Sequence, residues 1–319
     1  MQGPIKVAVI DDFQNVAGAM GEWGRLRPRA ETTIFTDNVT GQALVERLQP
    51  FDVVMVIRER TKFPRELIEK MPNLKLLITA GMRNLGIDLD ACRARGVIVC
   101  GTDTGSSPTA ELAFGMLLAL SRNIPAEQAS LRAGTWQTPR LGFGVKGLTL
   151  GIVGLGRLGA LMGSYGHACG MNVIAWSQNL TPDKATAAGA RRVEKSELFA
   201  QSDFVSLHLI LSERSRGIVG ASDLAQMKPG GFLINTSRAG LIDEPALIAA
   251  LKAGKIAGAA LDVYEREPLP AEAAILSAPN TLLTPHLGYA TRETYEIYFP
   301  QAVEDIEAWL AAKPVRVIS

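Results

Sequence analysis

Short apolar runs alternate with amphipathic stretches along the first hundred residues. Aliphatic and β-branched residues dominate the runs, whereas apolar positions recur at helical spacing in the stretches between them. This repeated order of strand and helix predicts a parallel sheet with helices on both faces, the α/β class. The expected strands are KVAVI, ETTIF, VVMVI, LKLLITA and GVIVC, and the expected helices cover residues 16–25, 42–48, 65–71 and 89–95.

A second α/β series follows a break in the pattern after residue 101. A loop rich in Gly, Thr and Ser precedes PTAELAFGMLLALSR, which predicts a long linker helix with Pro108 in its first turn. We expect the last helix, residues 291–312, to cross back to the first unit because it lies beyond the final strand of the second. The strands expected in the second unit are GLTLGIVG, NVIAW, DFVSLHLI, GGFLINT, IAGAALDVY and NTLLTP.

Composition narrows the class of protein. A chain of 319 residues with 47% hydrophobic residues favours two domains over one. Its 33 Lys and Arg nearly balance its 32 Asp and Glu, so we expect neither a nucleic acid nor an anionic membrane as a partner. The N-terminal apolar run is too short for a secretion signal, which predicts a cytoplasmic protein.

Two features that suggest other classes have simpler explanations. The uncharged segment 158–182 has small residues at the spacing of membrane helices, but its polar residues and glycines favour a helix followed by the strand MNVIAW. The three cysteines, Cys92, Cys100 and Cys169, show no metal-binding spacing, and we expect reduced core thiols with no metal site.

A glycine-rich loop indicates the ligand of the second unit. Gly154, Gly156 and Gly159 form G-x-G-x-x-G directly after an apolar strand and at the start of a helix. The first glycine permits a tight turn, the second lets a pyrophosphate approach the backbone, and the third allows close helix packing. The pattern predicts a dinucleotide at a helix N-terminus, against the alternative of glycines that serve only a tight turn.

The end of the next strand bears on the choice of dinucleotide. An acidic residue there favours NAD, and an arginine favours NADP. The sequence has AWSQN, so Ser177 supplies neither group. We expect NAD, with NADP left open.

Three histidines make the search for an acid or base short. His167 lies within a predicted helix and is expected to be structural. His208 lies at the end of the strand SLHLI, which suits either a cofactor-lining or a core position. His286 lies between a strand and Gly288, where sites of parallel α/β folds form, and it is the best acid/base candidate.

Charged partners for this histidine and for a substrate can be named. Either Glu265 or Glu267 could orient the imidazole, although an ordinary solvated loop would explain both. Arg238, which follows the strand FLINTS, has a planar fork that suits a carboxylate, against the alternative of a surface salt bridge with Asp243 or Glu244. Asp243 is expected to cap the helix EPALIAALKAG.

These motifs together resemble the D-isomer-specific 2-hydroxyacid dehydrogenases. The resemblance rests on INTSRAGLIDE, LDVYEREP, TPHLGYAT and GIVGLGRLG, and it extends over nearly the whole chain. The family includes phosphoglycerate dehydrogenases, glyoxylate or hydroxypyruvate reductases and D-lactate dehydrogenases. It implies a Rossmann domain (residues 101–287, with the linker helix) and a flavodoxin-like substrate domain (residues 1–100 and 288–319), with the site in the cleft between them, and a homodimer.

The resemblance also assigns roles to individual residues. It selects Glu267 over Glu265 as the partner of His286, the general acid/base, and gives Arg238 the substrate carboxylate. The implied reaction transfers a hydride between NAD(P) and a small D-2-hydroxy acid or 2-keto acid. Backbone amides of Gly81 and Met82 would also hold the carboxylate, and the implied cofactor neighbours are Thr109, Arg157, Leu158, Thr236 and Asp262, beside the glycines, Ser177 and His208.

Two alternative functions and the role of two arginines stay open at this point. Corepressors that sense NAD(H) share this fold and keep the same residues, so a non-catalytic binding protein is one. An NADP-linked glyoxylate or hydroxypyruvate reductase is another. Finally, Arg58 and Arg60 could meet an anionic substrate tail or could simply be solvated.

Overall fold

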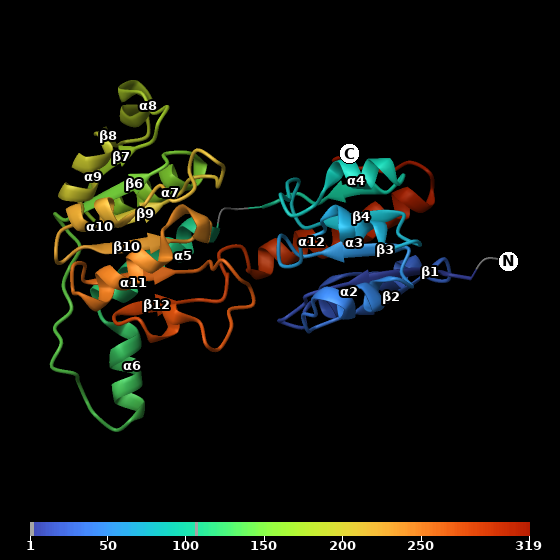
Figure 1. Cartoon of the computed structure of the whole chain (residues 1–319), viewed down its shortest axis with the longest axis horizontal. Coiled ribbons are helices and arrows are strands. Elements are labelled where there is room, and N and C mark those ends of the chain that lie inside the picture. The colour runs from blue at the N-terminus through green and yellow to red at the C-terminus, as the bar shows by residue number, and fades with distance from the viewer. Residues whose placement is uncertain (1–2, 106–107) are drawn as a thin grey trace. The chain divides into compact units, whose positions relative to one another are not determined.

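The computed structural model describes residues 3–105 and 108–319. The chain divides into two compact units, which are described separately: unit 1 is Met1–Ser106 with Thr291–Ser319, and unit 2 is Ser107–Ala290. Each unit is built on one parallel sheet, as the alternating pattern predicts. Figure 1 shows both sheets with their helices, unit 1 in blue to cyan with its last helix in red, and unit 2 in green to orange.

Unit 1 has a five-stranded sheet in the order β2-β1-β3-β4-β5, with every neighbouring pair parallel. This is the strand order of flavodoxin-like folds, in which the chain changes direction across the sheet between β1 and β3. The strands are β1 (Ile5–Val9), β2 (Ala30–Ile34), β3 (Val53–Val56), β4 (Leu76–Thr79) and β5 (Ile98–Gly101).

The helices of unit 1 include the last helix of the chain. Rings of Trp23 and Phe299 meet edge to face, so this helix packs within unit 1. The helix expected at residues 16–25 is broken at Gly21, whose backbone is extended. The helical elements are α1 (Ala17–Met20), η1 (Trp23–Leu26), α2 (Gly41–Leu48), α3 (Arg65–Glu69), α4 (Leu89–Ala94) and α12 (Arg292–Leu310).

Unit 2 has a seven-stranded parallel sheet in the order β12-β11-β10-β9-β6-β7-β8. Strands β7 and β8 extend the sheet on one side of β6, and β9 to β12 extend it on the other. This is the Rossmann arrangement, in which the strand order reverses between β6 and β9. The strands are β6 (Thr149–Val153), β7 (Asn172–Trp176), β8 (Arg191–Arg192), β9 (Phe204–Leu207), β10 (Phe232–Asn235), β11 (Gly258–Leu261) and β12 (Thr281–Leu283).

Helices cover both faces of this sheet, and α5 begins at Pro108 as expected. Asp243 caps α11 by accepting a hydrogen bond from the amide of Ala246, which confirms the predicted N-cap. The helical elements are α5 (Pro108–Ser121), α6 (Ile124–Arg132), α7 (Arg157–Ala168), α8 (Pro182–Ala187), α9 (Lys195–Gln201), α10 (Ala221–Gln226), η2 (Ala239–Leu241), α11 (Glu244–Lys252) and η3 (Ala274–Ser277).

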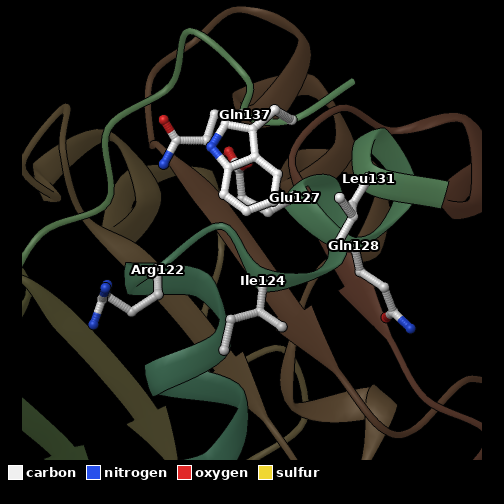
Figure 2. Close-up of a pocket in the computed structure, with 7 residues that line it drawn as sticks. Arg122, Ile124, Glu127, Gln128, Leu131 and Gln137 are labelled. Carbon is white, nitrogen blue, oxygen red and sulfur yellow. The ribbon is translucent and has the colours of Figure 1, made fainter. Parts of the chain in front are cut away.

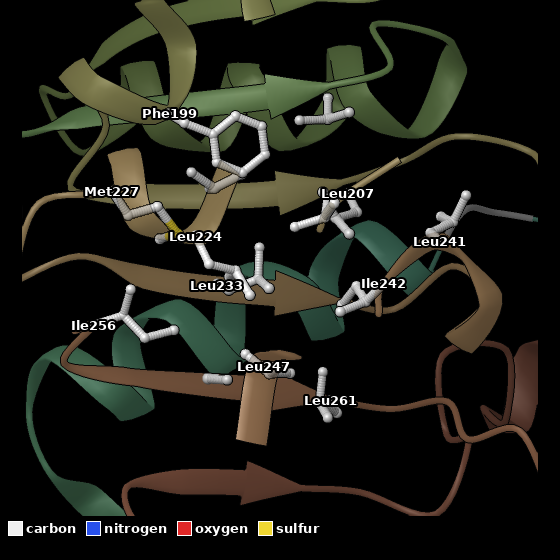
Figure 3. Packing of buried hydrophobic residues seen from close by; sticks show 14 of the residues in the cluster. Phe199, Leu207, Leu224, Met227, Leu233, Leu241, Ile242, Leu247, Ile256 and Leu261 are labelled. Carbon is white, nitrogen blue, oxygen red and sulfur yellow. The ribbon is translucent and has the colours of Figure 1, made fainter. Parts of the chain in front are cut away.

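Two buried clusters lie on opposite faces of the sheet of unit 2. Figure 3 shows one of them, in which Leu207, Leu233 and Leu261 of three neighbouring strands pack with side chains from α9, α10 and α11. Residues on the other face, such as Phe204 and Ile234, pack with α5 and α7. The strands of a parallel sheet that is covered on both faces are apolar throughout. This is why apolar and polar residues do not alternate along these strands.

The remaining structural expectations concern membranes, metals and thiols. Among the described residues, no helix has the length and apolarity needed to cross a bilayer, and segment 158–182 forms α7 and β7. Within residues 3–105 and 108–319, no group of three or more His, Cys, Asp and Glu side chains could hold a metal ion. The three cysteines carry free thiols, and those of Cys92 and Cys100 are buried.

Candidate active site

The strands of unit 2 end in register at one edge of the sheet. Pairing matches Trp176 with Val153, Val153 with Leu207, and Leu207 with Asn235; the series continues through Leu261 to Leu283. The residues that come next therefore form one row at the carboxyl edge, where ligands bind in open parallel sheets. In spatial order this row is Ser177, Gly154, His208, Thr236, Asp262 and Thr284. Five of these six residues are among the expected cofactor neighbours.

The glycine loop fits a bound pyrophosphate by the local geometry of its three glycines. Gly154 has φ +99°, and a β-carbon there would lie 2.9 Å from the backbone of His208. A β-carbon on Gly156 would meet nothing within 4 Å, which leaves open space beside the backbone. A β-carbon on Gly159 would collide with the carbonyl of Gly154. Helix α7 begins directly after Gly156, so its first amides face the loop.

Two buried polar atoms of the row have no hydrogen-bond partner in the described part of the chain. They are Nδ1 of His208 and Oγ1 of Thr236. Nε2 of His208 lies 2.8 Å from Oγ of Ser206, and burial lowers the pKa of His208 to about 4, so this imidazole is neutral near pH 7. Unsatisfied buried polar atoms beside a glycine loop fit a site for a polar ligand such as a dinucleotide.

His286 and Glu267 form the closest pair of ionisable groups at this edge. Nδ1 of His286 lies 2.5 Å from Oε2 of Glu267, and about one fifth to one quarter of each side chain is exposed. The other carboxylate oxygen of Glu267 accepts a hydrogen bond from the amide of Tyr264 (2.8 Å), which fixes the carboxylate. Glu265, the other candidate on this loop, is exposed. A carboxylate on Nδ1 orients the ring and favours the protonated imidazole.

Asp262 holds the loop that carries His286. One of its carboxylate oxygens accepts hydrogen bonds from the hydroxyl of Thr284 (2.5 Å) and the amide of Leu287 (2.7 Å), and the other accepts from the amide of Gly288 (2.8 Å). Burial raises the pKa of Asp262, and these three hydrogen bonds oppose that rise. The family resemblance implied Asp262 only as a cofactor neighbour; the signal that could have marked its contacts with this loop is an acidic residue directly after a buried strand.

Arg238 follows β10, the strand beside β11. Its loop is fixed by Asn235, whose side chain donates to the carbonyl of Arg238 (2.9 Å) and accepts from the amide of Ser237 (3.0 Å). Nη1 of Arg238 donates to the carbonyl of Ser237 (2.7 Å), and the side chain is partly exposed. The structure thus joins Glu267 to His286 directly, and places Arg238 after the carboxyl end of the neighbouring strand.

The remaining site residues of unit 2 lie around the same loops. Arg157 and Leu158 begin α7, directly after the glycine loop. Thr109, in the first turn of α5, donates its hydroxyl to the carbonyl of Gly288 (2.8 Å), two residues after His286. His167 is bound instead to the carbonyl of Gly189 (2.6 Å), in keeping with the structural position expected for it.

The candidates in unit 1 follow β3 and β4. The amide of Gly81 donates to the hydroxyl of Thr102 (2.9 Å), and the side chain of Met82 is 45% exposed. Nη1 of Arg58 donates to the carbonyl of Ala80 (3.2 Å).

Arg60 has a different set of partners. It donates to the carbonyl of Asp11 and to the hydroxyl of Tyr295, and its guanidinium lies 4.9 Å from the centre of the Phe13 ring. The positive charge of Arg60 also stabilises the carboxylate of the buried Asp11.

A pocket in unit 2 lies apart from this row. It is lined by α6 and its neighbours, and it includes no residue of the carboxyl edge. Figure 2 shows Ile124 and Leu131 on α6, with Gln137 from the segment that follows.

Comparison with known proteins identifies the family. A model of the D-isomer specific 2-hydroxyacid dehydrogenase NAD binding domain matches residues 114–288. The chain belongs to the D-isomer-specific 2-hydroxyacid dehydrogenase family. The match covers the glycine loop, the row at the carboxyl edge and His286, and members of this domain family bind NAD(P).

Individual members of the family are similar over most of this chain. A D-3-phosphoglycerate dehydrogenase of Methanocaldococcus jannaschii is 40% identical over 80% of this chain and 49% of its own length. A glyoxylate reductase of Thermococcus litoralis is 38% identical over 79% of this chain and 78% of its own. The chain spans about half the length of the curated phosphoglycerate dehydrogenases it matches.

A solved structure agrees over nearly the whole fold. The crystal structure of a phosphoglycerate oxidoreductase from Vibrio cholerae has a TM-score of 0.92, 39% sequence identity, and coverage of 97% of this chain and 99% of that one. This similarity supports the assignment of a Rossmann and a flavodoxin-like fold to the two units.

Proposed function

We propose that this protein transfers a hydride between NAD(P) and the C2 atom of a small D-2-hydroxy acid or 2-keto acid. The observation that carries the proposal is the His286–Glu267 contact at the carboxyl edge of an NAD-binding sheet. An oriented imidazole beside a dinucleotide site supplies the acid/base chemistry by which a carbonyl oxygen gains a proton or a hydroxyl group loses one. Bound NAD(P)H supplies the hydride.

His286 is the general acid/base in this proposal. Its Nδ1 is committed to Glu267, so Nε2 is the atom that gives a proton to the substrate oxygen as the carbonyl is reduced. The carboxylate of Glu267 stabilises the positive charge of the imidazolium. In the oxidising direction the same nitrogen accepts the hydroxyl proton.

Arg238 binds the substrate carboxylate. Its guanidinium can form two parallel hydrogen bonds with a carboxylate and can also polarise the adjacent carbonyl. Within unit 1, we propose that the backbone at Gly81 and Met82 gives a second hold on this group. The Gly81 amide already donates to Thr102, so the Met82 amide is the better donor of the two.

The rest of the substrate is small, and relatives named for 3-phosphoglycerate and for glyoxylate define the range to be tested. A substrate with a second anionic group could meet the cations Arg58 and Arg60, which lie after β3 in unit 1. NAD is the expected cofactor. The edge position Ser177 carries neither the carboxylate that favours NAD nor an arginine that favours NADP.

A panel assay tests the function. Oxidation of NADH and of NADPH would be followed with glyoxylate, hydroxypyruvate, pyruvate and 3-phosphohydroxypyruvate. We expect turnover of at least one keto acid and formation of the D-2-hydroxy acid. Binding of the cofactors without turnover of any keto acid would contradict the proposal and point to a dinucleotide-sensing protein.

We also propose that the protein forms a homodimer through α6 and the segment after it. Helix α6 has nine residues and none of them is buried, although a helix of this length needs packing to be stable. Large apolar side chains in this region are exposed: Ile124 by 51%, Leu131 by 55%, Trp136 by 80% and Leu141 by 94%. A second copy would cover this surface, which also includes the pocket of Figure 2.

Sedimentation velocity tests the dimer. The wild type is expected to sediment as two chains, and the double variant Trp136→Ser, Leu141→Ser as one. Leu276→Ser, which removes an apolar side chain that is 48% exposed elsewhere in unit 2, is the matched control and is expected to remain dimeric. A monomeric wild type at micromolar concentration would contradict this proposal.

A further inference from the structure

We propose that Arg83 is a specificity-determining residue, whose guanidinium binds a second anionic group, a carboxylate or a phosphate, at the end of the substrate remote from C1. The proposal rests on the function proposed above, in which the amide of Met82 is a donor to the C1 carboxylate. It deepens that function, because it names the substrate class as 2-keto acids with two anionic groups.

The loop that carries Arg83 follows β4, the strand between β3 and β5 in the sheet of unit 1. It therefore lies at the carboxyl edge of a parallel sheet, where such folds bind ligands. Met82 is 45% exposed, Leu85 is 62% exposed, and Arg83 is also exposed. Because the Cα atoms of Met82 and Arg83 are only about 3.8 Å apart, the arginine side chain is long enough to reach a ligand held at the Met82 amide.

A buried asparagine holds this loop in place. Asn84 is 8% exposed, and its side chain donates to the carbonyl of Arg58 (2.8 Å) and to the hydroxyl of Thr79 (2.9 Å). Its side-chain oxygen accepts a hydrogen bond from the amide of Gly86 (2.8 Å). These three hydrogen bonds belong to the residue next to Arg83, so the backbone that carries the guanidinium is fixed before any ligand binds.

The start of the loop is held by close packing. The amide of Gly81 donates to the hydroxyl of Thr102, directly after β5 (2.9 Å). Gly81 has φ +89°, and a β-carbon there would collide with Nη1 of Arg58, so this guanidinium lies against the loop backbone. The same nitrogen donates to the carbonyl of Ala80 (3.2 Å). The positive charge of Arg58 therefore lies beside the segment that leads to Arg83.

Three arginines follow the strands at this edge, and they differ in their existing partners. Arg58 forms an ion pair with Glu59 (3.8 Å). Arg60 donates to the hydroxyl of Tyr295 (3.3 Å). Among the described residues, nothing forms a hydrogen bond or an ion pair with the guanidinium of Arg83. Arg83 is thus the arginine of this edge whose donors are open to a ligand.

This difference favours Arg83 as the cation that a second anionic group meets. An anion that recruited Arg58 or Arg60 would compete with the partners that these side chains have, whereas binding to Arg83 displaces only water. A guanidinium forms two parallel hydrogen bonds with either a carboxylate or a phosphate. Because Arg83 is exposed, salt should weaken this attraction.

Matched pairs of keto acids test the inference. The two members of a pair have the same carbon chain, but only one carries a second anionic group. The pairs are oxaloacetate with 2-oxobutyrate, 2-oxoglutarate with 2-oxopentanoate, and 3-phosphohydroxypyruvate with hydroxypyruvate. The ratio of kcat/KM within a pair measures the preference for the second anion, which is a carboxylate in the first two pairs and a phosphate in the third.

Two substitutions of Arg83 are compared with a matched control. Arg83→Gln removes the charge, and Arg83→Lys keeps the charge without the planar fork. The control is Arg93→Gln, which makes the same change in net charge at another exposed arginine of unit 1. Arg93 lies on α4, where its side chain is 65% exposed and pairs with Asp90 (2.6 Å). All three substitutions are at exposed positions and should keep the thermal unfolding midpoint.

We expect the wild type to prefer the member with two anionic groups in at least one pair. Arg83→Gln should lower that kcat/KM ratio by about tenfold or more, and Arg83→Lys by about threefold, because lysine retains the charge. Arg93→Gln should retain the wild-type ratio. Raising the salt concentration should lower the ratio of the wild type more than that of Arg83→Gln.

An unchanged ratio in Arg83→Gln would overturn the inference, and so would a wild type that prefers the member with one anionic group in every pair. If the wild type turned over no keto acid, the proposed function would fail, and calorimetric titration of the NADH-saturated protein would decide. Binding of 2-oxoglutarate or 3-phosphohydroxypyruvate about tenfold more weakly by Arg83→Gln than by the wild type would uphold the anion site. Equal binding, or none, would overturn it.

Discussion

Nδ1 of His286 lies 2.5 Å from Oε2 of Glu267, although the two residues come from loops after different strands. Strands β11 and β12 are neighbours whose last residues, Leu261 and Leu283, are paired in register. The contact is therefore a consequence of strand order, since the loops begin at the same level of one sheet edge.

Glu267→Gln is expected to lower kcat by about 10² while NADH affinity stays within twofold. Glutamine can still accept a hydrogen bond from the imidazole, but it lacks the charge that stabilises the imidazolium. Steady-state kinetics with the best keto acid of the panel would measure the change. Glu265→Gln, on the exposed neighbouring carboxylate, is the control and should be close to wild type.

Arg238→Lys is expected to raise KM and lower kcat, because lysine retains the charge without the planar fork that binds a carboxylate. Arg238→Ala should lower kcat/KM further, by about 10² or more, because the carboxylate loses its cation. NADH titration should give the wild-type dissociation constant for both variants. Wild-type kcat/KM in the alanine variant would rule out this role for the guanidinium.

Substitution of alanine for two glycines of the loop should separate the effect on NADH affinity from the effect on stability. A β-carbon on Gly156 meets nothing in the protein, so Gly156→Ala is expected to keep its thermal unfolding midpoint and to bind NADH about tenfold more weakly by occupying the pyrophosphate's space. A β-carbon on Gly159 collides with Gly154, so Gly159→Ala should lose roughly 1–3 kcal/mol of stability. Unaltered NADH affinity of Gly156→Ala would argue against this pyrophosphate position.

Stability without cofactor should depend on pH through His208. Its pKa is about 4 when folded and near 6.5 when unfolded, so between these values the unfolded chain binds more protons. Acid in this range therefore favours unfolding, and the contribution is complete below about pH 4. The unfolding midpoint of His208→Asn, relative to wild type, is expected to rise as pH falls from 7 to 4. A constant difference between the two proteins would contradict a neutral, buried imidazole.

The fold could be predicted from sequence because each apolar run is a strand covered on both faces. The elements that the pattern missed are those without such runs. Strand β8 consists of Arg191 and Arg192, and it is a strand only because it pairs with the edge of β7. Helix α6 was missed because none of its residues is buried, so it lacks the core-facing pattern that marks the other helices. Gly21 interrupts a stretch that otherwise has helical periodicity.

Part of the site could be predicted from the sequence for a related reason. Gly154 and His208 follow strands directly, so the strand pattern placed them at one edge, whereas Asp262 was suggested only by the family resemblance. Spacing alone could not choose between Glu265 and Glu267, because loop conformation decides which carboxylate points inward. The hydrogen bonds from Leu287 and Gly288 to Asp262 were also invisible in the sequence, since they depend on the backbone turn at His286.

The most direct measurement of the central claim is the turnover of His286→Ala compared with wild type, with NADH binding measured on the same samples. The account predicts reduction of a 2-keto acid by the wild type, a loss of about 10² or more in kcat for the variant, and equal NADH dissociation constants. Equal kcat for the two proteins would contradict the assignment of the proton transfer to His286.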